Sequence, residues 1–342
     1  MESIKKPYPF KEYPVMQQPA LTPNEGQQAQ IARKFGMFLH FGINTFNNME
    51  WSDGTLPIES YCPTAIDADS WVRTAWEAGM NYVVLITKHH DGFCLWDTHT
   101  TTYSVNYSPN KTDVVHAVAE ACRKYSIKLG LYYSLWDRHE ACYADDEAYV
   151  QYMEKQLTEL MDGRYGEIVE LWFDGSWDKS CRAWQLDRLY SLVKTLQPSC
   201  QIGVNHTVRE YSEEATSPDD KYLPVNCRDR GPLRMFPSDF RLWDPHMCRE
   251  DDPKIYTFQG KEYYLPFEMT ICSRKEFSWF FSDIYEGKPL MDAEEIIRNY
   301  RILEKTNNLL VINLPPNRDG KLVEGDVKNL MYVAESLKIK RV

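Results

Sequence analysis

The chain has 342 residues, and its 39 Lys and Arg and 50 Asp and Glu residues give a formal net charge of −11 at pH 7. Hydrophobic residues make up 43% of the sequence, which is enough to bury a core and excludes disorder of the whole chain, while 16 Gly residues are too few for a collagen-like repeat. The acidic balance argues against nucleic acid or an anionic membrane surface as the main partner, because both bind basic surfaces.

Apolar runs alternate with segments of helical spacing from about residue 34 onward. The runs predict strands over residues 34–42, 81–88, 128–136, 167–175, 201–206, 262–273 and 308–316. The spacing between them predicts helices over residues 70–80, 112–127 (with Thr112 as its cap), 146–166, 186–199 and 292–306. Continuous apolar strands separated by helices are typical of a parallel sheet that is buried on both faces.

One segment, residues 207–262, interrupts this rhythm, because it is rich in Pro, Asp and Arg and lacks helical spacing. We interpret it as long loops over a barrel mouth, with weak or short elements between them, and residues 1–30 as a lead-in. No glycine-rich phosphate-binding motif follows a strand, which disfavours a nucleotide-binding doubly wound sheet. We therefore expect an α/β fold in which residues 1–342 form a single (β/α)8 (TIM) barrel domain.

Targeting and redox signals are weak in this sequence. It has no run of about 18 apolar residues, so we expect no membrane span, and its first residues lack the apolar core of a signal peptide. The nine Cys residues form no C-x-x-C motif, which favours buried thiols over a zinc ribbon or a disulfide scaffold. The compartment stays open between the cytoplasm and, if a signal was removed, the periplasm or the exterior. The oligomeric state also stays open.

The carboxylate of Asp174 ends a predicted strand in the run LWFDGSW. It could cap the turn at Gly175 and Ser176, or it could do chemistry, because a barrel places its active site at the carboxyl ends of its strands. Both interpretations stay open at this point. The neighbouring Trp172 and Trp177 favour a sugar site, since indole faces pack against the C–H faces of a pyranose.

Histidines also follow the first two predicted strands. In KHHDGF (88–93), successive side chains of an extended strand point to opposite faces, so His89 and His90 suit hydrogen bonds to a polyol better than chelation of one ion. His40, in MFLHFG, lacks the H-x-H pattern of metal-dependent amidohydrolase barrels. Cys94 lies between apolar neighbours and is interpreted as a buried thiol. We expect no metal and no cofactor.

Taken together, these motifs resemble glycoside hydrolase family 29, the retaining α-L-fucosidases. The resemblance covers about residues 30–340 and rests on KFGMFLHFG, EW at 50–51, KHHDGFCLWD, GLYYSLW, LWFDG and NLLVINLPPNRDG. It implies a (β/α)8-like catalytic domain. Family members often carry a β-sandwich after this domain, and we expect none in this chain.

The resemblance also implies a site. It places the catalytic nucleophile on Asp174, with a second carboxyl group about 5–5.5 Å away as acid and then base. The implied sugar-binding residues are His40, Glu50, Trp51, His89, His90 and one of Tyr132 and Tyr133, with Trp279 or Phe280 on the methyl side of fucose.

The acid/base is less well defined by the resemblance. SDFRLWD (238–244) is similar to a family motif and places Asp244 at this position, although the family has Glu there. Glu268, in LPFEMT, is the alternative. The substrate-binding arginine is either Arg230 or Arg241.

The expected function is therefore that of an exo-acting retaining α-L-fucosidase acting on fucosylated glycans or glycosides. The alternatives are a metal-dependent barrel hydrolase and a sugar-binding homologue that has lost catalysis. The sequence leaves the fucosyl linkage and the aglycone open.

Overall fold

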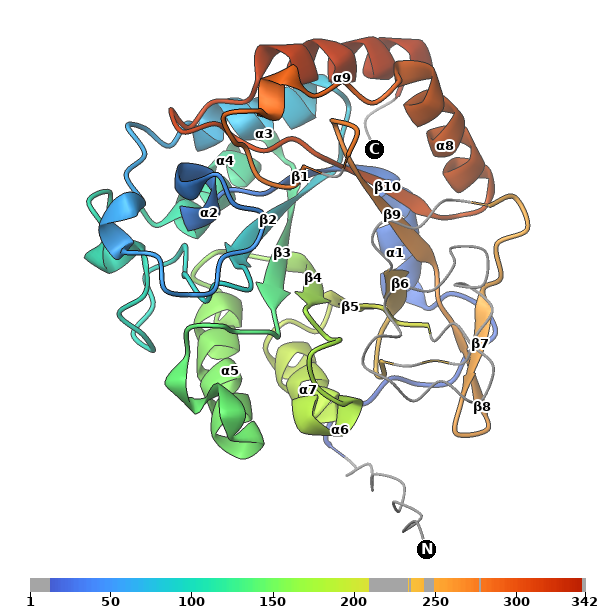
Figure 1. Cartoon of the computed structure of the whole chain (residues 1–342). Helices are drawn as coiled ribbons and strands as arrows, with labels where there is room; N and C mark the ends of the chain where they lie inside the picture. Colours follow the sequence, from blue (N-terminus) through green and yellow to red (C-terminus); the bar gives the residue numbers. More distant parts are fainter. Residues whose placement is uncertain (1–12, 209–232, 234, 243–248, 277, 340–342) are drawn as a thin grey trace, which may run out of the picture.

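The computed structural model describes residues 13–208, 233, 235–242, 249–276 and 278–339. Eight parallel strands close into a barrel, as expected (Figure 1). In barrel order they are β1 (Phe35–Leu39), β2 (Tyr82–Lys88), β3 (Lys128–Ser134), β4 (Ile168–Asp174), β5 (Gln201–Asn205), β6 (Phe240–Leu242), β9 (Phe267–Cys272) and β10 (Leu309–Asn313), which pairs back with β1.

Helices surround the barrel (Figure 1). They are α1 (Glu25–Arg33), α2 (Ile43–Asn47), α3 (Ala68–Glu77), α4 (Val114–Tyr125), α5 (Asp146–Met161), α6 (Cys181–Trp184), α7 (Leu186–Leu196), α8 (Ala293–Lys305) and α9 (Glu324–Leu337). The cap of α4 is Asp113 rather than Thr112, because the Asp113 carboxylate accepts the N–H of His116 at 2.8 Å. Among the described helices, none is long and apolar enough to cross a bilayer.

The segment over residues 207–262, predicted as long loops with short elements between them, contains two such elements among its described residues. One is β6, which the sequence did not locate because the strand has only three residues and a charged residue at its centre. The other is an antiparallel hairpin of β7 (Ile255–Phe258) and β8 (Lys261–Tyr264), which leads directly into the start of β9. The hairpin therefore lies toward the amino-terminal end of the barrel and not over its mouth.

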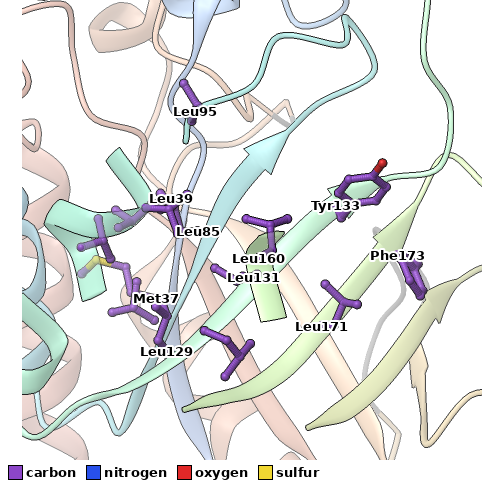
Figure 2. Close-up of a cluster of buried hydrophobic side chains, with 14 of the residues drawn as sticks. Met37, Leu39, Leu85, Leu95, Leu129, Leu131, Tyr133, Leu160, Leu171 and Phe173 are labelled. Atoms are coloured by element: carbon purple, nitrogen blue, oxygen red, sulfur yellow. The ribbon is translucent and has the colours of Figure 1, made fainter. Parts of the chain in front are cut away.

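Side chains alternate between two cores. One lies inside the barrel and comprises Phe38, Tyr82, Val84, Ile86, Tyr132, Trp172, Phe240, Leu242, Leu309 and Val311. The other lies between the strands and the helices, and Figure 2 shows part of it, from Met37 on β1 to Phe173 on β4. Because the period of a strand is two residues, β1, β2, β3, β4 and β10 each contribute side chains to both cores.

The amino-terminal end of the barrel is filled by buried charged and polar side chains. Arg33, the last residue of α1, forms an ion pair with Glu170 at 2.6 Å, and the hydroxyl of Tyr82 donates to Glu268 at 2.9 Å. Gly36 makes room for the Tyr82 ring, since a Cβ there would lie 2.6 Å from it. The interior of the barrel is therefore closed at this end, which leaves the carboxyl ends of the strands as the open end of its interior.

Candidate active site

The carboxyl ends of β1–β4 surround a small, narrow pocket. The lining residues are mostly aromatic: Phe38, His40, Trp51, His89, His90, Tyr132, Trp172, Asp174, Trp177 and Trp279. The pocket thus brings together seven of the residues that the resemblance implied: His40, Trp51, His89, His90, Tyr132, Asp174 and Trp279.

Asp174, the last residue of β4, is the carboxylate of this pocket and is 6% exposed. The hydroxyl of Tyr132 donates to its Oδ2 at 2.7 Å, and the amide of Asn205 donates to its Oδ1 at 2.9 Å. Burial raises the pKa of Asp174, while these two hydrogen bonds and one from the backbone of Gly175 oppose the rise. The carboxylate therefore both caps the turn and faces the pocket, with each oxygen held by a side-chain donor.

His40 lies just beyond β1 as a neutral imidazole. Its Nδ1 lies 2.8 Å from Oδ1 of Asn313, whose amide donates to the carbonyl of Trp279 at 2.8 Å. Since that amide nitrogen is the donor, Oδ1 accepts from His40, and the Nε2 of His40 is left as an acceptor. Burial lowers the pKa of His40 to about 3, so the ring stays neutral over the physiological range.

Contrary to expectation, His89 and His90 lie on the same side of the chain, with ring centroids 4.1 Å apart. The expectation of opposite faces was wrong because β2 ends at Lys88 and the chain then turns, with the N–H of Gly92 donating to the carbonyl of His89 at 3.1 Å. Strand alternation no longer applies there. Burial, with the nearby His90 and His40, lowers the pKa of His89 well below its usual value.

His90 connects the turn to the carboxylate. Its Nδ1 lies 2.7 Å from the hydroxyl of Ser134, and its Nε2 lies 3.6 Å from Oδ2 of Asp174. Three possible metal-ligand atoms lie within 4.8 Å of one another here, one each from His89, His90 and Asp174. These groups could therefore hold a metal ion. The metal-dependent alternative is therefore a question for experiment.

Glu50 lies at the pocket mouth and fixes the loop that follows β9. Its carboxylate accepts the backbone N–H of Trp279 at 3.0 Å and of Phe280 at 3.1 Å. The Trp279 ring lines the pocket 5.0 Å from the ring of His40, and Phe280 packs 4.9 Å from the ring of His89. Burial raises the pKa of Glu50, which these backbone donors oppose.

Trp51 forms the exposed rim of the pocket and is 46% exposed. Its ring stacks on that of Trp177 at 5.9 Å and meets that of Trp136 edge-on at 5.8 Å. The indole nitrogens of Trp177 and Trp172, and Nδ1 of His89, are buried and have no hydrogen-bond partner among the described residues. These atoms are free to bind the hydroxyl groups of a ligand.

Two candidates face the outer side of the sheet. Tyr133 faces the outer core and donates to Gln156 at 2.7 Å, so Tyr132 is the tyrosine of the site. Arg241 also points outward and binds both carboxylate oxygens of Asp252, at 2.6 and 2.7 Å, which excludes it from the pocket.

Glu268 was the alternative acid/base, and its position argues against this role. It lies near the start of β9 beside Glu170, and Glu170 precedes Asp174 on β4 by four residues, roughly 13 Å of strand. Glu268 is therefore at the closed end of the barrel. Asp244 and Arg230 lie outside the described residues.

Sequence reasoning did not select Ser134, Asn205 and Asn313, which orient the histidines and the carboxylate. Each is the last residue of its strand. A polar residue that ends an apolar strand is therefore the signal that could have found them, because such side chains reach the barrel rim.

The sequence and the structure resemble those of known proteins over nearly the whole length of this chain. A sequence profile of the family described as alpha-L-fucosidase matches residues 47–341. The chain is 32% identical to alpha-L-fucosidase 1 of Arabidopsis thaliana over 97% of its own length and 62% of that protein.

Two solved structures are also similar. A glycoside hydrolase 29 family member from an unknown rumen bacterium has 26% identity and a TM-score of 0.75, covering 92% of this chain and 56% of that one. Alpha-L-fucosidase isoenzyme 1 from Paenibacillus thiaminolyticus has 25% identity and a TM-score of 0.71, covering 92% and 75%. The chain thus spans about three fifths of the plant and rumen proteins.

Proposed function

The chain belongs to the α-L-fucosidase family, glycoside hydrolase family 29, and we propose on this premise that it is a retaining exo-α-L-fucosidase. It would release terminal α-L-fucosyl residues from glycans or glycosides. The observation that carries the proposal is the buried Asp174 carboxylate, held by Tyr132 and Asn205 in a pocket lined by three histidines.

Hydroxyl recognition is the first task that this pocket suits. The neutral His40 offers an acceptor, and the indole N–H groups of Trp172 and Trp177 offer donors. A buried polar atom without a partner destabilises a protein by about 1–3 kcal/mol, so a ligand that supplies partners binds favourably. The aromatic faces that line the pocket suit the C–H faces of a pyranose.

Nucleophilic attack is the second task. In a retaining mechanism Asp174 attacks the anomeric carbon, and the covalent glycosyl–enzyme is then hydrolysed by water. Burial raises the pKa of Asp174, but the donors Tyr132 and Asn205 stabilise its anion. The same donors hold the attacking oxygen in a fixed position, so the carboxylate does not have to reorient before it attacks.

For the acid/base we propose Asp244. In the sequence it follows Leu242, the last residue of β6, by two positions, and β6 runs toward the same rim as β4. Asp244→Ala should slow deglycosylation while sparing the first step for a substrate with a good leaving group, because general acid/base help is worth roughly 10²–10⁴-fold. Burst kinetics with an activated aryl fucoside measure this, and unchanged steady-state rates with a poor leaving group would contradict it.

The direct test of the function is turnover of a chromogenic aryl α-L-fucoside, with the anomer of the first-formed fucose read by NMR. We expect the α-anomer first, as retention requires. Fucose binding without turnover would favour the sugar-binding alternative, and a β-anomer as first product would exclude the double-displacement mechanism.

A further inference from the structure

A buried ion pair lies behind the two site histidines, on the side of the sheet away from the pocket. Lys88, the last residue of β2, has no exposed surface, and its Nζ lies 2.9 Å from a carboxylate oxygen of Asp137. The ammonium also donates to the hydroxyls of Tyr133 at 3.2 Å and Tyr149 at 3.1 Å. Tyr133 belongs to the outer core (Figure 2), so the pair lies between β2, β3 and α5.

The pair is built to remain charged. Burial alone would lower the pKa of Lys88, but Asp137, together with Tyr133 and Cys94, more than offsets this and raises it overall. The rings of Tyr133 and Tyr149 also face the ammonium, at 4.4 and 5.5 Å from their centroids. None of these groups lines the pocket.

Asp137 connects the ion pair to the turn that contains His89 and His90. Its second oxygen accepts the backbone N–H groups of His139 at 3.0 Å and Glu140 at 2.9 Å, which fixes the chain just after β3. From this fixed segment the N–H of Arg138 donates to the carbonyl of His90 at 2.9 Å. Asp137 also touches the turn itself, since a Cβ on Gly92 would lie 2.5 Å from its carboxylate.

We propose that Lys88 and Asp137 are positioning residues of the active site. Through Lys88 they fix the end of β2, and through the backbone of Arg138 they fix the carbonyl of His90, so that both rings are directed at the ligand. The inference rests on the proposed function of the pocket. Neither residue lines the pocket, and a merely structural ion pair would affect stability alone.

The test compares two double variants that each remove one buried ion pair. Lys88→Met/Asp137→Asn removes the pair behind the histidines, and the new amide oxygen can still accept the two N–H groups. Arg33→Met/Glu170→Gln removes the pair at the closed end of the barrel and is the matched control. Double variants are used because a single substitution leaves an unpaired buried charge.

We expect both variants to unfold at lower temperature than the wild type, but only the first to lose activity while folded. Its kcat/KM on an aryl α-L-fucoside should fall roughly 10²-fold, the effect of a misplacement of about 1 Å. The control should stay within about twofold. Equal kcat/KM values for the two folded variants would overturn the proposal.

Two further measurements keep the proposal testable. If the first variant does not fold, Tyr149→Phe removes one hydroxyl contact to Lys88 and should lower kcat/KM several-fold, while Tyr82→Phe at the closed end should not. If the wild type itself turns nothing over, the proposed function fails on its own. The imidazole ¹⁵N resonances of His89 and His90 then decide, because they should move in the first double variant only, and unmoved resonances would refute positioning.

Discussion

Asp174 has two donors that hold its carboxylate, and the simplest test of its role is to remove it. Asp174→Ala should reduce kcat on an aryl fucoside by more than the roughly 10²–10⁴-fold that acid/base help supplies, because no covalent intermediate can form. Azide should restore turnover and give the inverted β-fucosyl azide, identified by NMR. Rescue without inversion, or a variant that keeps most of its activity, would remove Asp174 as nucleophile.

Metal dependence is a separate question at the residue scale, because ligand atoms of His89, His90 and Asp174 lie close enough to hold an ion. We expect dialysis against a chelator to leave kcat/KM unchanged, since both oxygens of Asp174 already accept hydrogen bonds and the family chemistry uses carboxyl groups. Activity lost on chelation and restored by Zn²⁺ would instead support the metal-dependent hydrolase.

The stability contributed by Glu268 should depend on pH. Burial, and then the neighbouring Glu170, raises the pKa of Glu268 well above its usual value, so the folded state favours the protonated acid. The stability that the protonated Glu268 contributes to the folded state is fully present below the ordinary pKa near 4.5. It is lost as the pH rises through the higher pKa of the folded state. Glu268→Gln mimics the protonated acid, and its melting temperature relative to wild type should increase between pH 5 and pH 8.

Activity provides the second readout for this variant. Because Glu268 lies at the closed end of the barrel, Glu268→Gln should keep kcat/KM within about twofold of wild type. A large loss of deglycosylation rate in this variant would return Glu268 to the acid/base role and remove Asp244 from it.

At the scale of elements, α9 supports the loop that carries Trp279. Asp326, in the first turn of α9, accepts from Arg274 at 2.7 Å and from Tyr285 at 2.8 Å, and Arg274 in turn donates to the carbonyl of Lys288 at 2.8 Å. Asp326→Ala should raise KM several-fold, because the loop loses its anchor, and should lower the free energy of unfolding by about 3–5 kcal/mol. Kinetics and urea unfolding measure the two effects.

A control for this variant lies on the same helix. Glu324 forms an exposed pair with Lys328, and such pairs contribute little to stability because water and salt screen them. Glu324→Ala should therefore match the wild type in KM and in stability. Equal effects of the two substitutions would show that α9 does not act through Arg274.

The elements also show how far the sequence could predict the structure. The alternation of apolar strands with helices was sufficient for the barrel, but β6 was missed because three residues carry too little periodicity. Residues that end long strands, such as Asp174, were placed correctly. The choice between Tyr132 and Tyr133 stayed open, and Arg241 faces outward, because one step along a strand exchanges the two faces, and sequence alone does not fix that step. The bend that turns both His89 and His90 inward lies against Asp137 and Ser134, which are remote in the sequence.

The whole barrel separates stability from function along its axis. At the amino-terminal end, Arg33 is an ion-pair partner of Glu170, and Glu170 and Glu268 lie side by side. At the other end, the histidines and Asp174 surround the pocket. Changes at the first end should therefore alter the free energy of unfolding, and changes at the second should alter kinetics.

Arg33→Met tests this separation. It leaves the wholly buried Glu170 without its cation, which should lower the free energy of unfolding by about 3–5 kcal/mol near neutral pH. Urea unfolding measures this loss. Below the unfolding transition, kcat/KM should equal that of the wild type, since the substitution lies at the closed end of the barrel. A kinetic defect in the folded protein would show that the two ends are coupled through the inner core, and an unchanged free energy of unfolding would mean that the ion pair with Glu170 contributes nothing to stability.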